Sequence, residues 1–525
     1  MTLNRREFIK KASLGAAVVA GSSFLIGCNN TEAVAPAPAP ETWDHEADVV
    51  VVGGGNGGLS AAAAAAEEGK KVILCEISAF LGGGSAYSGG IIHAWDTRDW
   101  QHYREHTEDL HDPIIAKKFV ETLRQTYFPW LQKNGIPITK MPGGPGYNSD
   151  LNYIMGSGEQ GYLKHKAYFD ALAAYAESKG TTIMKQTRVL RLVIDENGVV
   201  CGVQAIKKGD SAPIFIKAGA VVLATGGFQS NKGLLAKYLG PNGDAARNMG
   251  TPYNTGSGML MAIGVGAMTT GSFATFSGTL CGIVPGPATE DSPEAYEKAR
   301  AGDPASLPGI SNGRPAVPNW VNYLFPDQSQ GIIVNLQGKR FIDETHPIDS
   351  KYARIPQEVM RQKRAMAFLI GDKTIHDSVA GSETIIKMYQ DQGGKVVIAD
   401  TLEELASKLQ EVHGVQKGAL LKTINEYNKA IDDGTTDKLE VTRTLNHNKI
   451  VTPPFYALPV TTCIYHTFGG LAINENAQVL DLNREPIPNL YACPPCAAIF
   501  REVYCGGIAS AGTFGYIAGK HIASR

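Results

Sequence analysis

The stretch of the chain that decides its fold runs from Ala47 to Glu76 and reads ADVVVVGGGNGGLSAAAAAAEEGKKVILCE. It predicts a buried strand, a glycine turn, a helix of small residues, and a second strand that ends in an acid. Gly53 and Gly55 would permit a tight turn and a close approach of the backbone to a pyrophosphate, and Gly58 would let the helix lie against the strand. The start of the helix would then face the phosphates with free N–H groups.

Glu76 lies eighteen residues after Gly58, at the end of the second strand. A carboxylate at that place accepts hydrogen bonds from a ribose 2′-hydroxyl, which argues against NADP. Because a strand, a helix and an acid surround the glycine motif, the stretch predicts a dinucleotide site rather than an unrelated glycine-rich loop.

The first 28 residues predict a twin-arginine signal peptide. Arg5 and Arg6 precede an apolar run from Ala12 to Gly27, which is short for a membrane span. The sequence LIGC that ends at Cys28 resembles a bacterial lipobox, so we expect a lipid anchor at Cys28; the alternative is an uncleaved anchor helix. Residues 29–44 are rich in Pro and Ala and predict an extended tether. The mature protein is therefore expected in the periplasm or on the outer cell surface.

The composition narrows the classes of partner. The chain has 525 residues, a net charge of -2 and no basic block, which argues against a nucleic-acid partner. No second long apolar run follows the signal peptide, so membrane contact is expected only through the lipid anchor. The eight cysteines include no CxxCH motif, so no c-type haem is expected to be attached. Cys493 and Cys496 are the one close pair; packed free thiols are favoured over a disulfide or a metal site with Cys463 or Cys505, and no metal site is assigned.

The rest of the chain predicts an α/β body with an inserted domain. A glycine-rich loop at 81–90 and a buried strand at 217–224, which ends in Thr225-Gly226-Gly227, belong with the dinucleotide motif. Residues 272–454 differ in texture, with Pro-rich loops and segments rich in Lys and Glu. Such a block between two glycine-rich parts predicts a second domain that covers the first. We therefore predict a dinucleotide-binding domain made of residues 45–271 and 455–525, with a capping or substrate domain at 272–454.

An ordered set of motifs resembles the flavoprotein family of fumarate reductases, urocanate reductases and 3-ketosteroid dehydrogenases. The set comprises the first glycine motif with Glu76, GGGSAYSGG at 82–90, AVVLATGGF at 220–228, NTGSGMLMAIGVGA at 254–267, IIVNLQGKRFIDE at 332–344, YHTFGGLAINENAQVLD at 465–481, IPNLYAC at 487–493, and GGIASAGTFGYIAG at 506–519. The resemblance implies a Rossmann-like FAD-binding domain of the GR2 type and an inserted α+β capping domain. It also implies hydride transfer between FAD and one carbon of a C=C or CH–CH bond beside a carbonyl or carboxyl group.

The resemblance also implies which residues hold FAD. Val189 would offer its backbone to the adenine, and Ala224, Thr225 and Gly226 would pass the pyrophosphate. Ser88, Gly89 and Gly90 would line the isoalloxazine, and Gly83, Gly84 and Ser85 of the same loop would also bind the cofactor. The turn at Gly506-Gly507 would point N–H groups at the N1/O2 edge of the flavin, where a helix N-terminus stabilises the negative charge of the reduced ring.

The chain departs from the fumarate reductases where their chemistry lies. Alignment from the GKRF segment places Ile348 at the position of their proton-donating arginine, and an isoleucine cannot donate a proton. Tyr504 stands where their second substrate arginine precedes the Gly-Gly turn, which is the pattern of ketosteroid dehydrogenases and tricarballylate-dehydrogenase-like relatives. Cys493-Pro494-Pro495 replaces their usual Gly-Glu, so one expected contact to the flavin is missing.

Four residues are candidates for the chemistry. His466 matches a substrate-binding histidine of the fumarate reductases; a protonated imidazole would bind a carboxylate and a neutral one a carbonyl, and the alternative is a buried histidine bonded to backbone. Tyr504 would donate a hydrogen bond to a substrate oxygen, or would pack on the flavin edge. Arg501 would supply a cation, or would lie at the surface in an ion pair. Tyr87 would reach the substrate from the flavin-facing loop, or would pack.

Together these features predict an exported FAD-dependent reductase of an α,β-unsaturated carbonyl or carboxylate compound. An exported chain without NAD(P)H or haem would draw electrons from a separate c-type cytochrome or quinol-linked donor. The alternatives are a ketosteroid- or tricarballylate-type dehydrogenase that introduces the double bond, a fumarate or urocanate reductase, and a flavoprotein that only relays electrons or binds a ligand.

Overall fold

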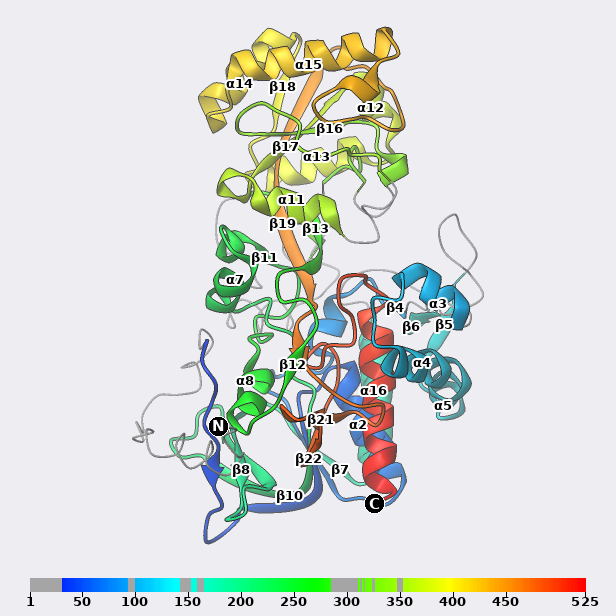
Figure 1. The fold of residues 1–525 in the computed structure, drawn as a ribbon, viewed down its shortest axis with the longest axis vertical. Coiled ribbons are helices and arrows are strands. Elements are labelled where there is room, and N and C mark those ends of the chain that lie inside the picture. Colours follow the sequence, from blue (N-terminus) through cyan, green and yellow to red (C-terminus); the bar gives the residue numbers. More distant parts are fainter. Residues whose placement is uncertain are drawn as a thin grey trace.

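The protein consists of two bodies stacked along one long axis, as the computed structural model shows (Figure 1). Each body has its own hydrophobic core, and the second core runs from Leu280 to Val460. The residues that the structure describes are 31–92, 100–141, 153–157, 165–284, 310–311, 314–315, 317–322, 326–346 and 353–525. The signal peptide prediction and Ile348 lie outside these residues.

The larger body is built on a nine-stranded sheet that contains the motif strands. Its strands are β1 (Ala37–Pro38), β2 (His45–Val52), β3 (Val72–Cys75), β7 (Thr181–Met184), β8 (Thr187–Ile194), β9 (Val200–Lys207), β10 (Ile214–Leu223), β21 (Gln478–Leu480) and β22 (Pro486–Ala492). Strands β2, β3, β7, β10 and β22 run parallel, and β8 and β9 form an antiparallel hairpin. The carboxyl ends of the parallel strands therefore meet at one edge of the sheet, where dinucleotides bind in such folds.

Two helices of small residues pack against each other beside this sheet: α2 (Asn56–Glu67) and α16 (Gly507–Ala523). A Cβ atom at Gly515 would lie 2.1 Å from the carbonyl oxygen of Gly57, and one at Gly519 would lie 2.5 Å from that of Ala61. The glycines therefore allow a close approach of the two backbones.

The larger body contains further helices and short strands. They are α3 (Trp100–Thr107), α4 (Pro113–Thr122), α5 (Phe128–Lys133), α6 (Lys166–Ser178), α7 (Lys232–Leu239), α8 (Ser257–Gly264), β4 (Ile91–Ile92), β5 (Ile138–Lys140), β6 (Tyr153–Met155), β12 (Thr269–Thr270) and β20 (Gly470–Leu471).

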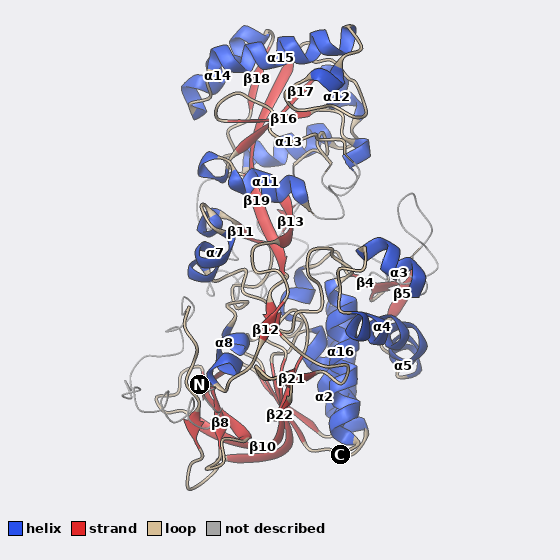
Figure 2. Ribbon diagram, in the orientation of Figure 1, coloured by secondary structure: helices blue, strands red, loops and turns tan. Residues whose placement is uncertain are grey.

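The second body is a mixed sheet with helices packed around it (Figure 2). Its strands are β11 (Arg247–Asn248), β13 (Phe276–Gly282), β16 (Ile332–Asn335), β17 (Ala367–Asp372), β18 (Val397–Ala399) and β19 (Phe455–Thr467). Its helices are α11 (Arg354–Arg361), α12 (Lys373–Ser378), α13 (Ser382–Asp391), α14 (Leu402–His413) and α15 (Lys417–Asp432). This body is the inserted α+β domain that the sequence predicts.

Strand β19 is the main connection between the two bodies (Figure 1). Its residues Phe455, Leu458 and Val460 pack in the second core, whereas Ile464 packs in the first. The predicted boundary between residues 454 and 455 therefore falls before a strand that both bodies share. A disulfide between Cys281 of β13 and Cys463 of β19, with Cα atoms 6.2 Å apart, joins the two strands at this junction.

The second core also holds a buried carboxylate between two arginines. Glu344 is fully buried and accepts hydrogen bonds from Arg340 at 2.6 and 3.0 Å and from Arg443 at 3.1 Å. The arginines hold the pKa of Glu344 below its usual value, against the effect of burial. The GKRF segment thus has a structural role here, because its Arg340 forms this buried ion pair.

The N-terminal segment differs from the predicted tether. The chain docks from Val34 onward: Val34 N–H donates to the Leu260 carbonyl, β1 pairs with the edge strand β8, and Ala39 N–H donates to the Ile194 carbonyl. Alternating Ala and Pro explain this, because an extended chain can add to a sheet edge through its alanine N–H groups while the prolines face away from the ladder. The prediction of an extended conformation agrees with the structure, but the segment is bound to the domain rather than free.

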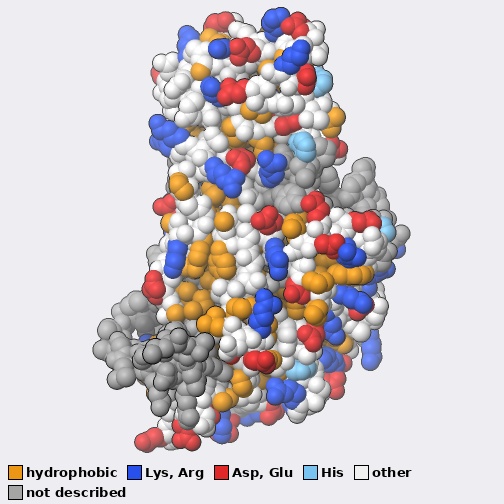
Figure 3. All heavy atoms as spheres, viewed as in Figure 1, with side chains coloured by type: hydrophobic (Ala, Val, Ile, Leu, Met, Phe, Trp, Pro, Cys, Tyr) orange, Lys and Arg blue, Asp and Glu red, His pale blue; other side chains and the backbone are white. Residues whose placement is uncertain are grey.

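The surface face in Figure 3 carries lysine and arginine interspersed with aspartate and glutamate. It therefore presents no large field of a single sign on that face. Within the described part of the chain, no helix has both the length and the apolar character needed to span a bilayer.

Candidate active site

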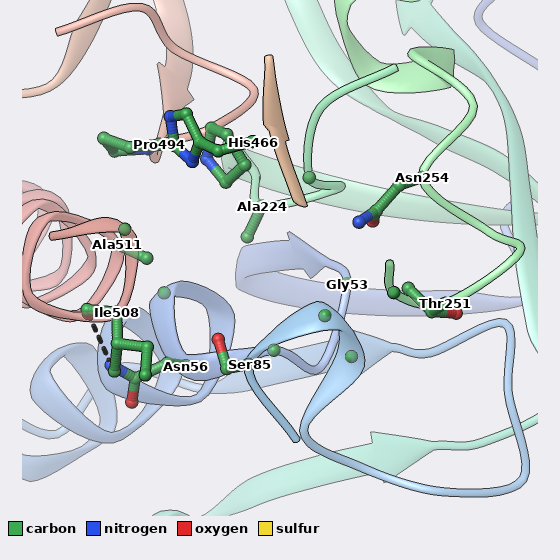
Figure 4. Close-up of a pocket in the computed structure, with 18 of the residues that line it drawn as sticks. Gly53, Asn56, Ser85, Ala224, Thr251, Asn254, His466, Pro494, Ile508 and Ala511 are labelled. Carbon is green, nitrogen blue, oxygen red and sulfur yellow. Dashed lines mark hydrogen bonds between the residues drawn. The ribbon is translucent and has the colours of Figure 1, made fainter. Parts of the chain in front are cut away.

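A cavity of about 950 Å³ lies at the carboxyl edge of the main sheet and extends to the second body. Its walls come from the starts of α2 and α16, the loops at 83–89 and 224–226, the segment 249–257, and strands β13 and β19. His466 and Pro494 lie together on one side of the cavity, and Thr251 and Asn254 lie on the other (Figure 4). Asn56, at the start of α2, donates to the Ile508 carbonyl of α16 at 2.9 Å and so ties the two helix starts together.

The glycine positions form a cradle that side chains would fill. Gly53 has φ +106°, and a Cβ there would lie 2.4 Å from the Ala224 carbonyl oxygen. A Cβ at Gly58 would lie 1.8 Å from the Gly53 oxygen, so this glycine permits the packing of α2 on the strand and does not itself line the cavity. Gly226 has φ +76°, and its Cβ would lie 2.2 Å from Asn254 Oδ1. Bare backbone at Gly53 and Gly226 suits a pyrophosphate that passes between them.

Glu76 lies where the sequence places it, at the end of β3 in the cavity wall. It is buried, and its carboxylate accepts hydrogen bonds from Gly54 N–H at 2.5 Å and Ser78 N–H at 2.8 Å. A carboxylate has about four acceptor positions, so hydroxyl groups of a ribose can still donate to it. Four other residues that the sequence predicts to hold FAD also line the cavity: Gly55, Val189, Ala224 and Thr225. Arg188 lines the cavity as well, although the sequence did not predict it.

The flavin-facing loop is mostly at the cavity, with one exception. The lining includes Gly83, Gly84, Ser85, Tyr87, Ser88 and Gly89. Gly90 is instead a packing position, because a Cβ there would lie 1.9 Å from the ring of His165. Tyr87 is buried in the cavity wall, so it lies where it would touch a bound ligand.

His466, Tyr504 and the first residue of α16 converge at one point of the wall. Tyr504 Oη accepts a hydrogen bond from Gly507 N–H at 2.7 Å. A Cβ at Gly507 would lie 3.1 Å from His466 Nδ1 and 3.2 Å from Tyr504 Oη, and the two rings have centroids 5.5 Å apart. Gly506 lies behind this point with φ +99° and turns the chain into the helix. Gly507 N–H is therefore paired with a phenol in the protein itself.

Burial keeps His466 and Tyr504 uncharged. It lowers the pKa of His466 to about 3 and raises that of Tyr504 to about 12, although the Gly507 N–H opposes the shift at Tyr504. No residue in the described part of the chain hydrogen-bonds to the His466 imidazole, so the alternative of a histidine bonded to backbone does not describe this ring. A neutral imidazole and a phenol suit a carbonyl oxygen rather than a carboxylate.

A β-bulge adds Tyr465 to the site. Ser277 of β13 pairs with His466, and the next residue, Gly278, pairs with Ile464, so Tyr465 has no partner across the ladder. A bulge re-aims a side chain, and both Tyr465 and His466 line the cavity although they are neighbours on a strand. Ser277 Oγ donates to Tyr465 Oη at 2.8 Å. Alternation along a strand would have placed Tyr465 on the opposite face, so the sequence pattern could not have found it.

Arg501 does not join the other candidates. It is exposed and does not line the cavity, since the loop that carries it bends to the surface before Val503 turns inward. The prediction that Arg501 supplies a cation to the site is therefore not supported by its position. Among the described residues that line the cavity, Arg188 is the sole arginine or lysine, and it lies beside Val189 at the nucleotide end.

The cysteines near the site are not arranged as a metal centre in the described residues. Cys493 and Cys496 are free and buried, and Cys463 is joined to Cys281, so it is not available as a ligand for the close pair. Burial raises the pKa of Cys496 to about 11 and raises that of Cys493 as well. Both are therefore thiols at neutral pH, while Pro494 and Pro495 between them line the cavity.

These features define a two-domain flavoprotein whose nucleotide cradle opens toward a capping domain. The comparisons with known proteins agree. The chain belongs to the family of FAD-binding domains, whose model matches residues 48–509. It binds FAD and is an FAD-dependent oxidoreductase, as predicted.

Similar proteins include several reductases. The chain is 28% identical over 478 residues to a fumarate reductase (cytochrome) of Shewanella frigidimarina, with 87% of this chain and 73% of that protein aligned. It is 26% identical to the urocanate reductase of Eggerthella lenta, with 86% and 70% aligned. It is 29% identical over 330 residues to the NADH:acrylate oxidoreductase of Vibrio harveyi, where the match spans 62% of this chain but 28% of that longer protein.

Solved structures share the fold. The open conformation of a flavocytochrome c3 fumarate reductase matches with a TM-score of 0.66 at 24% identity, covering 92% of this chain and 79% of that one. The 3-ketosteroid Δ4-(5α)-dehydrogenase of Rhodococcus jostii matches with a TM-score of 0.64 at 22% identity, covering 94% and 100%. The predicted fold class, a Rossmann-like FAD-binding domain with an inserted capping domain, is confirmed.

Proposed function

We propose that this protein reduces the C=C bond of an α,β-unsaturated ketone or a related uncharged carbonyl compound. The observation that carries the proposal is the meeting of His466, Tyr504 and Gly507 at the start of α16, with both side chains uncharged. Bound FAD supplies the hydride that one carbon of the double bond receives. The described residues at this end of the cavity bind and polarise the carbonyl oxygen next to that bond.

Tyr504 is the main donor to the carbonyl oxygen in this mechanism. Its acceptor position is occupied by Gly507 N–H, so its own proton points elsewhere, and Tyr504 lies in the cavity wall. Negative charge grows on the carbonyl oxygen as the β-carbon accepts a hydride, and a preorganised donor in a site shielded from water stabilises that charge. The neutral His466 ring adds a second hydrogen bond at the same place without a formal charge.

Charge in the cavity also disfavours a dicarboxylate such as fumarate. In the described lining the one guanidinium lies at the nucleotide end, whereas the exposed carboxylates Glu105 and Glu108 border the opening near α3. A dianion would gain no ion pair with the described residues beside His466. The relatives named fumarate reductase and urocanate reductase therefore support the reaction class for this protein, and not their particular substrates.

The setting of the reaction is part of the proposal. The twin-arginine and lipobox patterns support export and attachment at Cys28, in the periplasm or on the outer surface. Electrons then come from a separate c-type cytochrome or quinol-linked protein; a cytochrome-type relative supports the first of these. In that setting reduction of the double bond is the favoured direction, and a dehydrogenase that introduces the bond is the second candidate because Tyr504 replaces the arginine.

The test is anaerobic oxidation of reduced viologen by the FAD-loaded protein, with a 3-keto-4-ene steroid, an aryl enone, an aryl acrylate, urocanate and fumarate offered side by side. Turnover with a ketone and none with fumarate is expected. Turnover with fumarate alone would overturn the proposal. A saturated ketone that reduces the flavin, while no enone reoxidises it, would favour the dehydrogenase. A flavin that dithionite reduces and no acceptor reoxidises would favour an electron relay.

A further inference from the structure

Gln229 is a buried amide in the cavity wall whose oxygen has no partner among the residues that the structure describes. Its exposed fraction is 2%, and it follows the loop that carries Gly226. Its Nε2 donates to the Tyr465 carbonyl oxygen at 3.3 Å, and no group in the described residues donates to its Oε1. Buried side-chain oxygens in native proteins are almost always hydrogen-bonded, so an unpaired one in a cavity wall indicates a ligand that pairs with it.

The orientation of this amide follows from its neighbour. The Tyr465 carbonyl can only accept a hydrogen bond, so the NH₂ side of Gln229 must face it. The reverse orientation would place two oxygens against each other. Oε1 is therefore the group that is left over, and the wall presents an acceptor at this position.

Gln229 lies at the His466 end of the cavity. Its partner Tyr465 directly precedes His466 on β19, and Ser277 and Met249 line the same region. Gly227 keeps the loop bare beside the amide, because a Cβ there would lie 2.7 Å from Oε1. The oxygen thus lies at the junction of the two bodies, close to where the proposed carbonyl site is found.

We propose that Gln229 is a specificity-determining residue that accepts a hydrogen bond from a hydroxyl group of the substrate. This inference rests on the proposed function and deepens it. The substrate has two anchors: a carbonyl oxygen at His466 and Tyr504, and a hydroxyl group on a remote part of the molecule at Gln229. The substrate class is a hydroxyl-bearing α,β-unsaturated ketone, of which hydroxyaryl enones are accessible probes.

The preference comes from the cost of an unpaired acceptor. A site built to hydrogen-bond a hydroxyl group rejects the analogue that lacks it, because the buried oxygen then loses both water and its partner. We expect the hydroxyl-bearing ligand to bind about tenfold or more tightly than its parent. A methoxy analogue keeps the bulk but has no donor, so it is expected to bind no better than the parent.

The experiment measures binding to the oxidised, FAD-loaded protein through the change in flavin absorption, which needs no turnover. The probes are benzylideneacetone and its ortho-, meta- and para-hydroxy and para-methoxy derivatives. The variants are Gln229→Met, which keeps the length of the side chain but has no hydrogen-bonding group, and Asn248→Leu as a control. Asn248 is equally buried and does not line the cavity, and no described residue pairs with its Oδ1.

The proposal predicts that the wild type and Asn248→Leu prefer at least one hydroxy isomer over the parent, and that Gln229→Met binds the two within about twofold. The ratio of two affinities cancels any general loosening of the wall. No preference in the wild type, or a preference that survives in Gln229→Met, would overturn it. An unchanged ratio with altered FAD retention or midpoint potential would assign the oxygen to the flavin ring instead. Turnover of the same ligands tests the proposed function separately, since discrimination in binding without turnover would sink only that proposal.

Discussion

Replacement of Tyr504 by Phe tests the carbonyl site most directly. The change removes one hydroxyl group, which accepts Gly507 N–H at 2.7 Å and which we propose donates to the substrate oxygen. Loss of one such donor typically costs 10² to 10³ in kcat, or about 2.7–4 kcal/mol. In this site the freed Gly507 N–H can turn toward the same oxygen and replace part of the loss. We therefore expect a decrease near the lower limit, about 100-fold or about 2.7 kcal/mol.

The assay is the rate at which an enone reoxidises the dithionite-reduced protein in a single turnover, since this step does not depend on the electron donor. The FAD content, read from the absorption spectrum, should be unchanged because Tyr504 is not part of the nucleotide cradle. Tyr516→Phe is the matched control: it removes a phenol from α16, the helix that begins just after Tyr504, and Tyr516 packs against Trp130 outside the cavity lining. A Tyr504→Phe protein that keeps its FAD and reacts within about twofold of the wild type would refute the reasoning.

Three further predictions concern charge and cross-links. Burial lowers the pKa of His466 to about 3, so the ring stays neutral above about pH 5 and the rate of enone reduction should not decrease near pH 6.5 because of this residue. In the unfolded chain the pKa of this histidine is near 6.5, so the free energy of unfolding should decrease as the pH drops from 6.5 toward 3. Glu344→Gln leaves two buried arginines without their charged partner and should lower the free energy of unfolding by about 3–5 kcal/mol in urea titrations. In the wild type the pKa of Glu344 is lowered, so its contribution to stability is lost as the pH falls below 4.5. Cys281→Ser removes a disulfide that spans 182 residues, whose stabilisation is at most about 5 kcal/mol in the chain-entropy model. The melting temperature should therefore fall in this variant and in the reduced wild type. An equal melting temperature of the wild type before and after reduction would contradict the disulfide.

The nucleotide half of the site was predictable because its signals are local. Gly53 adopts a positive φ in the turn, and Gly58 must leave room for the Gly53 oxygen, so the glycines at these positions are required by geometry within one strand, turn and helix. Glu76 follows at the end of the next strand. These residues lie where the sequence placed them.

The positions of residues at the proposed substrate end of the cavity depend on contacts between distant segments, which the spacing of residues in the sequence does not predict. Tyr465 reaches the cavity only because β13 and β19 pair with a bulge, which is a property of the register between two distant segments. Arg501, three residues from Tyr504, lies at the surface because its loop bends outward. Gln229 is a candidate because its NH₂ group is paired with the Tyr465 carbonyl of a strand that lies far away in the sequence.

By itself the sequence indicated the strand, glycine turn and helix of the dinucleotide motif, because residue periodicity and the conformational freedom of glycine act over short stretches of chain. A change of composition indicated the inserted domain, and the resemblance of the ordered motifs to a known family implied FAD. The tertiary structure alone decided that the predicted tether docks on the sheet, that Cys281 meets Cys463, and which uncharged groups surround the carbonyl site. Those outcomes depend on which distant backbones pair and in what register, and a shift of one residue sends a side chain to the other face of a strand.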